Sequence, residues 1–281
     1  MLLTLLSISV MGLFLTATPA PLVIHFLDVG YGDAIVLHLP EGGTVLVDGG
    51  APERGPQVAT VLRDKGVQEL DYLVVTHFHK DHVGGLDPIL KEFMPIYNRQ
   101  KQTDKLGRIL IPLLPSGVEP EIELLKAEIE RRPYSIVSRG RTILASPSVR
   151  IDVLHPKALT GDANEDSLAV RVTHGRITIL LGGDVGLEAQ KELLHEYGSR
   201  LKADVIKIPH HGGETEESFI EAVRPQVAIL TVGPNSYGLP KPEVLKMYQK
   251  IGAHIHRTDE VGAITIITDG RSFTVHSERL P

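Results

Sequence analysis

Four potential metal ligands lie within residues 76–82 of the sequence. This segment contains His77, His79, Asp81 and His82, and it directly follows an apolar stretch that predicts a buried strand. Residues two apart in an extended segment project to the same side, so His77 and His79 can bind one ion together. Asp81 and His82 fall at the turn into a helix, where they can reach a second ion about 3.5–4 Å away. The competing interpretation, a histidine-rich surface loop, fits poorly with a position after a buried strand.

Two later segments place more candidate ligands at the ends of predicted strands. An apolar run ends at Asp184, where a carboxylate between two metals could sit. Residues 205–209 lead into His210 and His211, and the spacing does not decide which of the two binds. Taken singly, each segment is explained equally well by ordinary polar residues at a strand end. Together with residues 76–82, they favour a two-metal site.

Asp48 also ends a predicted strand, directly before two glycines. One interpretation makes it a carboxylate that orients a ligand histidine. The other makes it a turn-forming aspartate. The sequence supports both equally.

The composition restricts the chemistry that such a site can use. The chain of 281 residues is 42% hydrophobic and 23% charged, which is typical of a globular protein with a large core. It has no cysteine, so a transition metal has to be held by histidine nitrogens and carboxylate oxygens. The formal charge of -6 argues against a generally basic, nucleic-acid-binding surface, although a local groove or a metal can supply positive charge.

The elements that must position these residues alternate between strands and helices. Glycine-rich breaks within residues 22–50 indicate hairpins, which argues against a doubly wound parallel sheet and favours two facing sheets covered by helices. We therefore predict an α+β fold, a four-layer αββα sandwich. Residues 94–118 are expected to form an irregular excursion near the active site. Helices are predicted at 57–65, 83–92, 120–131, 187–197, 215–223 and 241–251, and strands at 22–27, 34–39, 44–47, 72–76, 142–145, 149–154, 168–173, 177–181, 204–208, 226–231, 254–257, 263–268 and 272–276.

The first 20 residues differ from the rest of the chain. Residues 1–15 are apolar and are followed by small residues and a proline, as in a signal peptide with its cleavage region. The apolar run is shorter than the roughly 20 residues of a membrane-spanning helix. No Lys or Arg precedes it, so a membrane anchor or a wrongly assigned start codon compete with this interpretation. We expect residues 1–20 to be a signal peptide or anchor, residues 22–281 to form one domain, and the protein to be exported.

Taken together, the motifs resemble those of the metallo-β-lactamase-fold hydrolase superfamily. They are Asp-Gly-Gly at 48–50, His-x-His-x-Asp-His-x-Gly-Gly at 77–85, Gly-Asp at 183–184 and His-His-Gly at 210–212. The flanking segments 26–34, 164–168, 207–212, 232–238 and 257–259 look like the hydrolase domain of ComEC-type DNA internalisation competence proteins and their stand-alone relatives. The resemblance extends over residues 22–276.

This resemblance implies a site with two divalent ions, Zn²⁺ or Mn²⁺, and a metal-bound hydroxide as nucleophile, because a bound metal lowers the pKa of water to about 7. By motif, His77 and His79 would bind the first metal, and Asp81 and His82 the second. Asp184 would bridge the two, and His210 or His211 would complete the second site. Asp81 and Asp184 are the expected catalytic residues. Residues expected to support the ligands or contact substrate are Asp33, Asp48, Asn164, Ser167, Asn235 and Tyr237.

The sequence departs from the superfamily pattern at two places. Residues 164–167 stand where the wider superfamily usually has another ligand histidine, as they do in the competence branch. Leu239 stands where many relatives have a histidine. By the resemblance, the first departure bears on the occupancy of the first metal site, and the second on the rate or the choice of substrate.

The leading functional hypothesis is a phosphodiesterase, a nuclease acting on DNA in connection with a membrane DNA-uptake machinery. A second hypothesis is a hydrolase of another phosphoester, a lactone or a β-lactam. A third is a non-catalytic metal-bearing module that binds DNA or the cell envelope.

Overall fold

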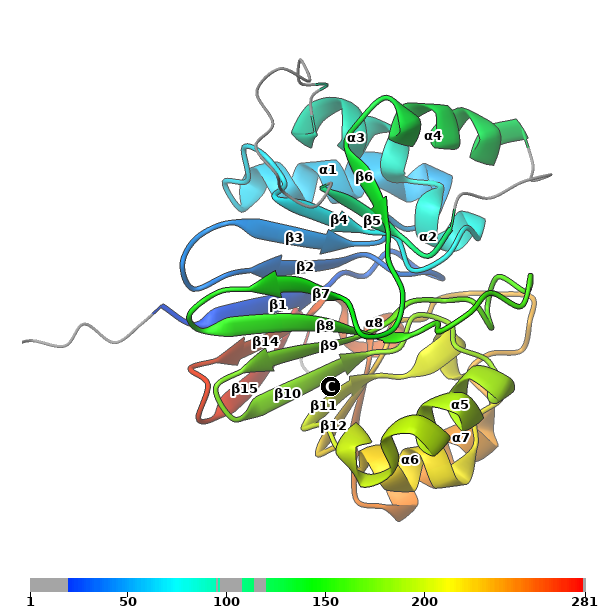
Figure 1. Cartoon of the computed structure of the whole chain (residues 1–281). Helices are drawn as coiled ribbons and strands as arrows, with labels where there is room; N and C mark the ends of the chain where they lie inside the picture. Colours follow the sequence, from blue (N-terminus) through cyan, green and yellow to red (C-terminus); the bar gives the residue numbers. More distant parts are fainter. Residues whose placement is uncertain (1–19, 95, 97–107, 114–119, 280–281) are drawn as a thin grey trace, which may run out of the picture.

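The computed structural model describes residues 20–94, 96, 108–113 and 120–279. Two β-sheets lie face to face, and helices cover the outer side of each sheet (Figure 1). The predicted four-layer αββα sandwich is therefore confirmed. The predicted signal peptide or anchor lies almost entirely outside the described residues. Among the residues that are described, no helix is long and apolar enough to cross a membrane.

The first sheet has eight strands. In spatial order they are β15 (Phe273–Ser277), β14 (Ile264–Thr268), β1 (Leu22–Phe26), β2 (Ile35–His38), β3 (Thr44–Val47), β4 (Tyr72–Val74), β5 (Ile109–Ile111) and β6 (Tyr134–Ile136). β1, β2 and β3 pair antiparallel, so the glycine-rich breaks between them do make hairpins. From β3 to β6 the strands run parallel.

The second sheet has seven strands. In spatial order they are β13 (His254–Arg257), β12 (Val227–Leu230), β11 (Val205–Lys207), β10 (Ile177–Leu181), β9 (Ala169–His174), β8 (Val149–His155) and β7 (Thr142–Ala145). β7 to β10 pair antiparallel, whereas β10 to β13 run parallel. Both sheets are therefore mixed, and each has a parallel block.

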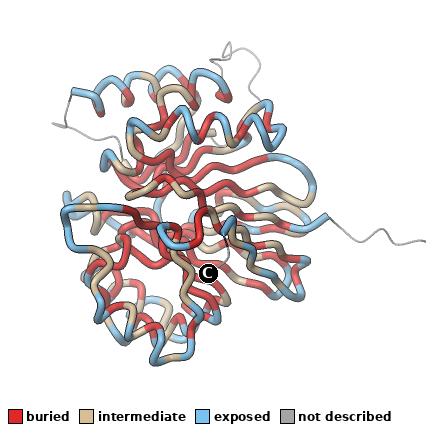
Figure 2. Tube along the Cα trace, turned by 180° about the vertical axis from the view of Figure 1, so that it is seen from behind, coloured by how far each residue is buried: buried red, intermediate tan, exposed pale blue. Residues whose placement is uncertain are grey.

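Alternating apolar side chains build the core between the sheets and the layers outside them. In β3, Val45 and Val47 join the core between the sheets, whereas Leu46 points to the helices on the first sheet. This is the two-residue period of a strand that is buried on both faces. Figure 2 shows the buried residues concentrated in the strands and on the sheet-facing sides of the helices.

The helices form the two outer layers (Figure 1). On the first sheet lie α1 (Gly55–Asp64), α3 (Leu86–Phe93) and α4 (Pro120–Glu130), with the short α2 (Lys80–Val83) nearby. On the second sheet lie α5 (Leu187–Tyr197), α6 (Glu217–Val223) and α7 (Pro242–Lys250). A short helix, α8 (Thr258–Val261), follows β13.

Two predictions for the first half need correction. Residues 109–111 are a fully buried strand of the first sheet instead of part of an irregular excursion, and β6 was not predicted. Residues 97–107 and 114–119 lie outside the described residues. The helix predicted at 83–92 corresponds to α3, which begins at Leu86, and the shorter α2 precedes it, with Gly84 and Gly85 between the two helices. Both positions require glycine, because a Cβ at Gly84 would lie 2.4 Å from Pro52 and one at Gly85 2.1 Å from the Gly49 carbonyl oxygen.

One edge of the sandwich collects the candidate site. Parallel strands end at the same edge, and the segments that follow β3, β4, β10 and β11 carry Asp48, residues 77–82, Asp184 and His211. Residues from both sheets and both halves of the sequence therefore meet there.

Candidate metal centre

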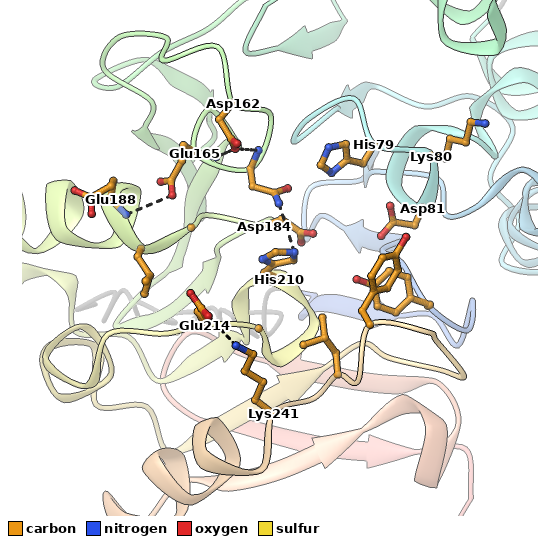
Figure 3. Close-up of a pocket in the computed structure, with 17 residues that line it drawn as sticks. His79, Lys80, Asp81, Asp162, Glu165, Asp184, Glu188, His210, Glu214 and Lys241 are labelled. Atoms are coloured by element: carbon orange, nitrogen blue, oxygen red, sulfur yellow. Dashed lines mark hydrogen bonds and ion pairs between the residues drawn. The ribbon is translucent and has the colours of Figure 1, made fainter. Parts of the chain in front are cut away.

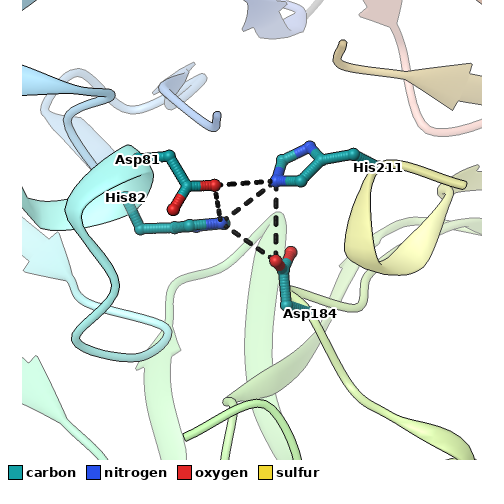
Figure 4. Close-up of side chains that lie close together, drawn as sticks. All are labelled: Asp81, His82, Asp184 and His211. Carbon is teal, nitrogen blue, oxygen red and sulfur yellow. Dashed lines mark hydrogen bonds and ion pairs between the residues drawn. The ribbon is translucent and has the colours of Figure 1, made fainter. Parts of the chain in front are cut away.

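Four side-chain donors from three segments converge on one point. The donor atoms of Asp81, His82, Asp184 and His211 all lie within 4.8 Å of one another (Figure 4). Asp81 and His82 come from α2 on the first sheet, whereas Asp184 and His211 follow β10 and β11 on the second. His82, Asp184 and His211 are buried, and Asp81 is 22% exposed. The cluster is therefore closed on the protein side and accessible at Asp81.

The spacing of these donors fits a four-coordinate metal ion. Nε2 of His82 lies 3.2 Å from Nε2 of His211 and 3.2 Å from Oδ2 of Asp184. Oδ2 of Asp81 lies 3.5 Å from His82 Nε2 and 3.3 Å from His211 Nε2. Oδ2 of Asp184 lies 3.5 Å from His211 Nε2. A tetrahedral ion with bonds of about 2.0–2.1 Å needs donors about 3.3–3.4 Å apart. Two imidazoles and two carboxylates are also a donor set that zinc and manganese accept.

Hydrogen bonds aim both imidazoles at the cluster. His82 Nδ1 donates to Asp48 Oδ2 at 2.8 Å, and His211 Nδ1 donates to the Thr231 carbonyl oxygen at 2.7 Å. Each ring thereby presents Nε2 to the cluster. Metal-binding histidines are commonly oriented in this way, by a hydrogen bond from the other ring nitrogen to a carboxylate or a backbone carbonyl. Asp48 is therefore a carboxylate that orients a histidine. Its φ of 58° shows that it also makes a turn, so both interpretations of the sequence apply.

The structure separates the two neighbouring histidines of the His-His-Gly motif. Both adopt φ of 50° in the left-handed region, within the short 3₁₀ turn Pro209–Gly212. His211 joins the four-donor cluster, whereas His210 points into the adjacent cavity, where its Nε2 lies 3.4 Å from Nδ2 of Asn164. Of the two histidines that the sequence could not distinguish, the structure therefore places His211 with the other candidate ligands.

His77 and His79 form a second, looser group of donors. Nε2 of His77 lies 3.0 Å from Nδ1 of His79 and 3.9 Å from Oδ2 of Asp184. Asp184, a member of the four-donor cluster, thus also lies near His77, where a bridging ligand would be. Oδ1 of Asn164, in the segment that replaces the usual histidine, is buried and has no hydrogen-bond partner. The donors that lie where the first metal was expected are therefore His77, His79 and the carboxylate of Asp184.

Ser167, a residue expected near the site, supports ligands on both sides. Its Oγ accepts a hydrogen bond from the Asp184 backbone N–H at 3.0 Å and lies 3.5 Å from His77 Nδ1. Asn235 does not line the cavity that contains Asp81 and Asp184, and its side chain makes hydrogen bonds within its own loop. Tyr237 lies at the rim of the adjacent cavity and is 72% exposed.

A buried lysine beneath the cluster was missed by the sequence reasoning. The Lys207 side chain is fully buried, and its ammonium contacts Asp33 Oδ2 at 2.7 Å, Gly183 O at 3.0 Å and Asp184 Oδ1 at 3.2 Å. These three acceptors match the three donors of an ammonium group. Asp33, which was expected to support the site, does so through Lys207 and by accepting a hydrogen bond from Thr231 Oγ1. The sequence did contain an indication of this contact, because a lysine within the apolar strand β11 has to be paired with an acidic side chain when it is buried.

Burial and neighbouring charges shift the pKa values of the site residues. Burial raises the pKa of Asp184, but the neighbouring cations, His82 foremost, outweigh burial and hold this pKa well below its ordinary value. Burial lowers the pKa of His82, but Asp184 and Asp48 outweigh it and raise this pKa well above its ordinary value. Burial and His82 hold the pKa of His77 well below its ordinary value, which keeps it in the neutral form that binds metals.

A cavity of about 830 Å³ opens over the donors (Figure 3). Asp81, Asp184, His79 and His210 line its floor, together with Tyr31. Figure 3 shows Asp162, Glu165 and Glu188 on one side of the cavity and Lys80 and Asp81 on the other. The cavity is large enough for a small ligand.

This fold and this donor cluster define the chain as a member of the metallo-β-lactamase superfamily, whose family model matches residues 27–233. The chain is 30% identical over 263 residues to ComE operon protein 3 of Bacillus subtilis. The aligned region covers 86% of this chain and 32% of that protein. It is 26% identical to Competence protein ComA of Neisseria gonorrhoeae, over 84% of this chain and 31% of that protein. The predicted resemblance to ComEC-type proteins is thus confirmed, and the chain spans about a third of the length of these relatives.

A solved structure supports the fold. CmlA, a diiron beta-hydroxylase from Streptomyces venezuelae, matches with a TM-score of 0.53 over 88% of this chain and 54% of that chain. At 16% identity, this likeness concerns the architecture alone.

Proposed function

We propose that the protein is a metal-dependent hydrolase that cleaves phosphodiester bonds. The four-donor cluster of Asp81, His82, Asp184 and His211 carries this proposal, because two of its members, Asp81 and Asp184, line an open cavity. A divalent ion bound there would make a water molecule acidic and polarise the scissile phosphoryl group. The donor set and its spacing fit zinc and manganese.

The residues of the chain would prepare this chemistry by positioning. Asp48 and Thr231 fix the two imidazoles, and Lys207 fixes one oxygen of Asp184 while leaving Oδ2 in the cluster. A rigid set of donors needs little rearrangement on binding an ion or a substrate, and this preorganisation lowers the barrier. Asp81, the accessible member of the cluster, faces the cavity where substrate would lie.

The choice of a phosphodiester rests on the competence relatives and on the motifs shared with them. We further propose that DNA is the substrate, in connection with a membrane DNA-uptake machinery, and that residues 1–20 export the protein. The acidic formal charge of -6 makes the metal centre the main attraction for phosphate.

Edman sequencing of the protein recovered outside the cytoplasm tests the export proposal, and an intact N-terminus on cytoplasmic protein would contradict it.

The test of the hydrolase proposal combines metal analysis with an activity screen. The purified protein, loaded with Zn²⁺ or Mn²⁺, is assayed on single-stranded DNA, duplex DNA, bis(p-nitrophenyl) phosphate, p-nitrophenyl phosphate, a lactone and nitrocefin. We expect the phosphodiesters to be cleaved and His82→Ala to abolish this cleavage. Turnover of nitrocefin or the lactone alone would refute the phosphodiesterase proposal. Full metal occupancy without turnover of any substrate would indicate a binding module.

A further inference from the structure

A row of aromatic rings leads from the metal centre to the surface. The Tyr31 ring lies 4.5 Å, centroid to centroid, from the imidazole of His211. The ring of Tyr237 lies 5.3 Å beyond it, at an interplanar angle of 34°. Both tyrosines line the cavity over the donors. Tyr237 is therefore two ring contacts away from a candidate metal ligand.

Close backbone approaches fix the inner part of this row. A Cβ at Gly233 would lie 2.6 Å from Gly30, which brings the loop after β12 against the residue before Tyr31. A Cβ at Gly32 would lie 2.1 Å from the carbonyl oxygen of Asp81, so the residue after Tyr31 packs directly on a candidate ligand. Only glycine permits both approaches. The position of Tyr31 beside the donors is thus built into the backbone.

Asn235 holds the outer part of the row. Its Nδ2 donates to the carbonyl oxygens of Gly233 and Leu239 at 2.9 and 2.8 Å. Its Oδ1 accepts from the backbone N–H groups of Tyr237 and Leu239 at 3.0 and 3.1 Å. One side chain therefore closes the loop and fixes the backbone position from which the Tyr237 ring projects.

This ordered loop leaves an aromatic side chain in solvent. Tyr237 is 72% exposed, and among the exposed large hydrophobic side chains of the described residues it is the only aromatic one. A loop held by four hydrogen bonds that displays an aromatic face beside a candidate active site is a preorganised binding surface. Scattered exposed apolar residues carry no such meaning.

The charges around the cavity favour the aromatic side for an anionic strand. Asp162, Glu165 and Glu188 lie across the cavity from Lys80 (Figure 3). A polyanion is repelled by this acidic wall, and the attraction on the other side would come mainly from a metal ion at the donor cluster, because the Lys80 ammonium lies 3.9 Å from Oε2 of Glu121. The bases attached to such a strand would then meet the tyrosine rings.

Building on the proposed function, we propose that Tyr237, backed by Tyr31, is a stacking subsite for one unpaired nucleobase next to the scissile phosphate. Every base has a π-face, so the subsite would accept any base while rejecting duplex DNA, in which both faces are already stacked. It would therefore make single-stranded DNA or the frayed end of a duplex the preferred substrate.

Binding of fluorescein-labelled strands to the metal-loaded protein tests this subsite. A twelve-residue oligothymidine is compared by anisotropy with an abasic strand of the same length and charge. Base stacking contributes about 1–3 kcal/mol, so we expect the oligothymidine to bind about tenfold more tightly. Tyr237→Ala and Tyr237→Leu should both bring the ratio of the two affinities close to one. The leucine variant should do so because an apolar side chain without an aromatic ring cannot stack on a base. Tyr237→Phe should restore the preference.

Leu124→Ala is the matched control, because Leu124 is 71% exposed on α4 and does not line the cavity. Its binding ratio should equal that of the unmodified protein. Equal binding of the two strands by the unmodified protein, or a preference that survives Tyr237→Ala, would overturn the proposal. Gel analysis of the same strands separates the two proposals. Base preference without cleavage would refute the hydrolase alone, and cleavage without base preference would refute the subsite alone.

Discussion

Replacing Lys207 by Met should cost the protein much of its stability. The substitution keeps an apolar chain of similar length and removes the ammonium that lies between Asp33 and Asp184. Both carboxylates are buried, at 1% and 2% exposure, so neither can recover the lost interaction from water. Lys207→Met therefore leaves two buried groups of like charge without their cation.

The size of this effect follows from the geometry. Removing one partner of a buried ion pair costs about 3–5 kcal/mol, and here one ammonium serves two carboxylates. Natural domains have a total stability of about 5–15 kcal/mol. At about 2 °C per kcal/mol for a chain of this size, the melting temperature should fall by about 6–10 °C. A metal ion at the cluster should offset part of this loss, because it supplies positive charge to Asp184.

Calorimetry or urea unfolding of the metal-free and metal-loaded proteins measures the effect. Lys207→Met combined with Asp33→Asn removes one of the stranded charges, so we expect the double variant to be more stable than Lys207→Met alone. The control is Lys191→Met, an exposed lysine on α5 that pairs at the surface. A Lys207→Met variant within about 1 kcal/mol of the unmodified protein would refute the reasoning.

Three further predictions concern the metal ligands and a histidine outside the site. His211→Ala should lose the ion of the four-donor cluster in metal analysis while His210→Ala keeps it, and equal losses would contradict the assignment of the ligand. Asp48→Asn should weaken metal binding about 10–100-fold in competition with a chromogenic chelator, and an unchanged affinity would show that the hydrogen bond to His82 is dispensable. Burial, with Lys65 and then His38, lowers the pKa of His25 to about 4. The unfolded chain therefore binds a proton between pH 6.5 and 4 that the folded chain does not, and the free energy of unfolding should fall as the pH drops through this window. His25→Gln should flatten that dependence in urea titrations, and an unchanged slope would refute it.

The strands and the ends of strands could be predicted because their patterns are local. Apolar runs bounded by glycines gave the hairpins of residues 22–47, and the donors at 77–82 and 184 appeared where such runs ended. β5 was missed because its three buried residues follow a polar segment without a clear period and are followed by Pro112 and Pro115. The close contacts of Gly84 with Pro52 and of Gly85 with Gly49 could not be predicted, because they join residues that are far apart in the sequence.

The partners of the ligands could not be predicted for the same reason. No sequence pattern indicates that Thr231 orients His211, 20 positions away, or that Asp33 reaches Lys207, 174 positions away. The first contact joins the segments that follow two neighbouring strands of the second sheet, and the second contact joins the two sheets. The choice between His210 and His211 depends on two left-handed backbone angles, which the sequence alone does not reveal. Lys207 itself could have been identified, because a charged residue within an apolar strand needs a counter-charge wherever it is buried.

The origin of the four donors in both sheets gives a bound ion a mechanical role. His82 and His211 are 129 positions apart in the sequence, and their imidazole nitrogens lie 3.2 Å apart across the join between the sheets. An ion held by both would close a long loop of the chain, which is the role that a disulfide has in other proteins. The sequence has no cysteine with which to make such a bond. The metal would thus serve as the cross-link of the sandwich, and its release would loosen the two halves of the protein at the edge where substrate enters.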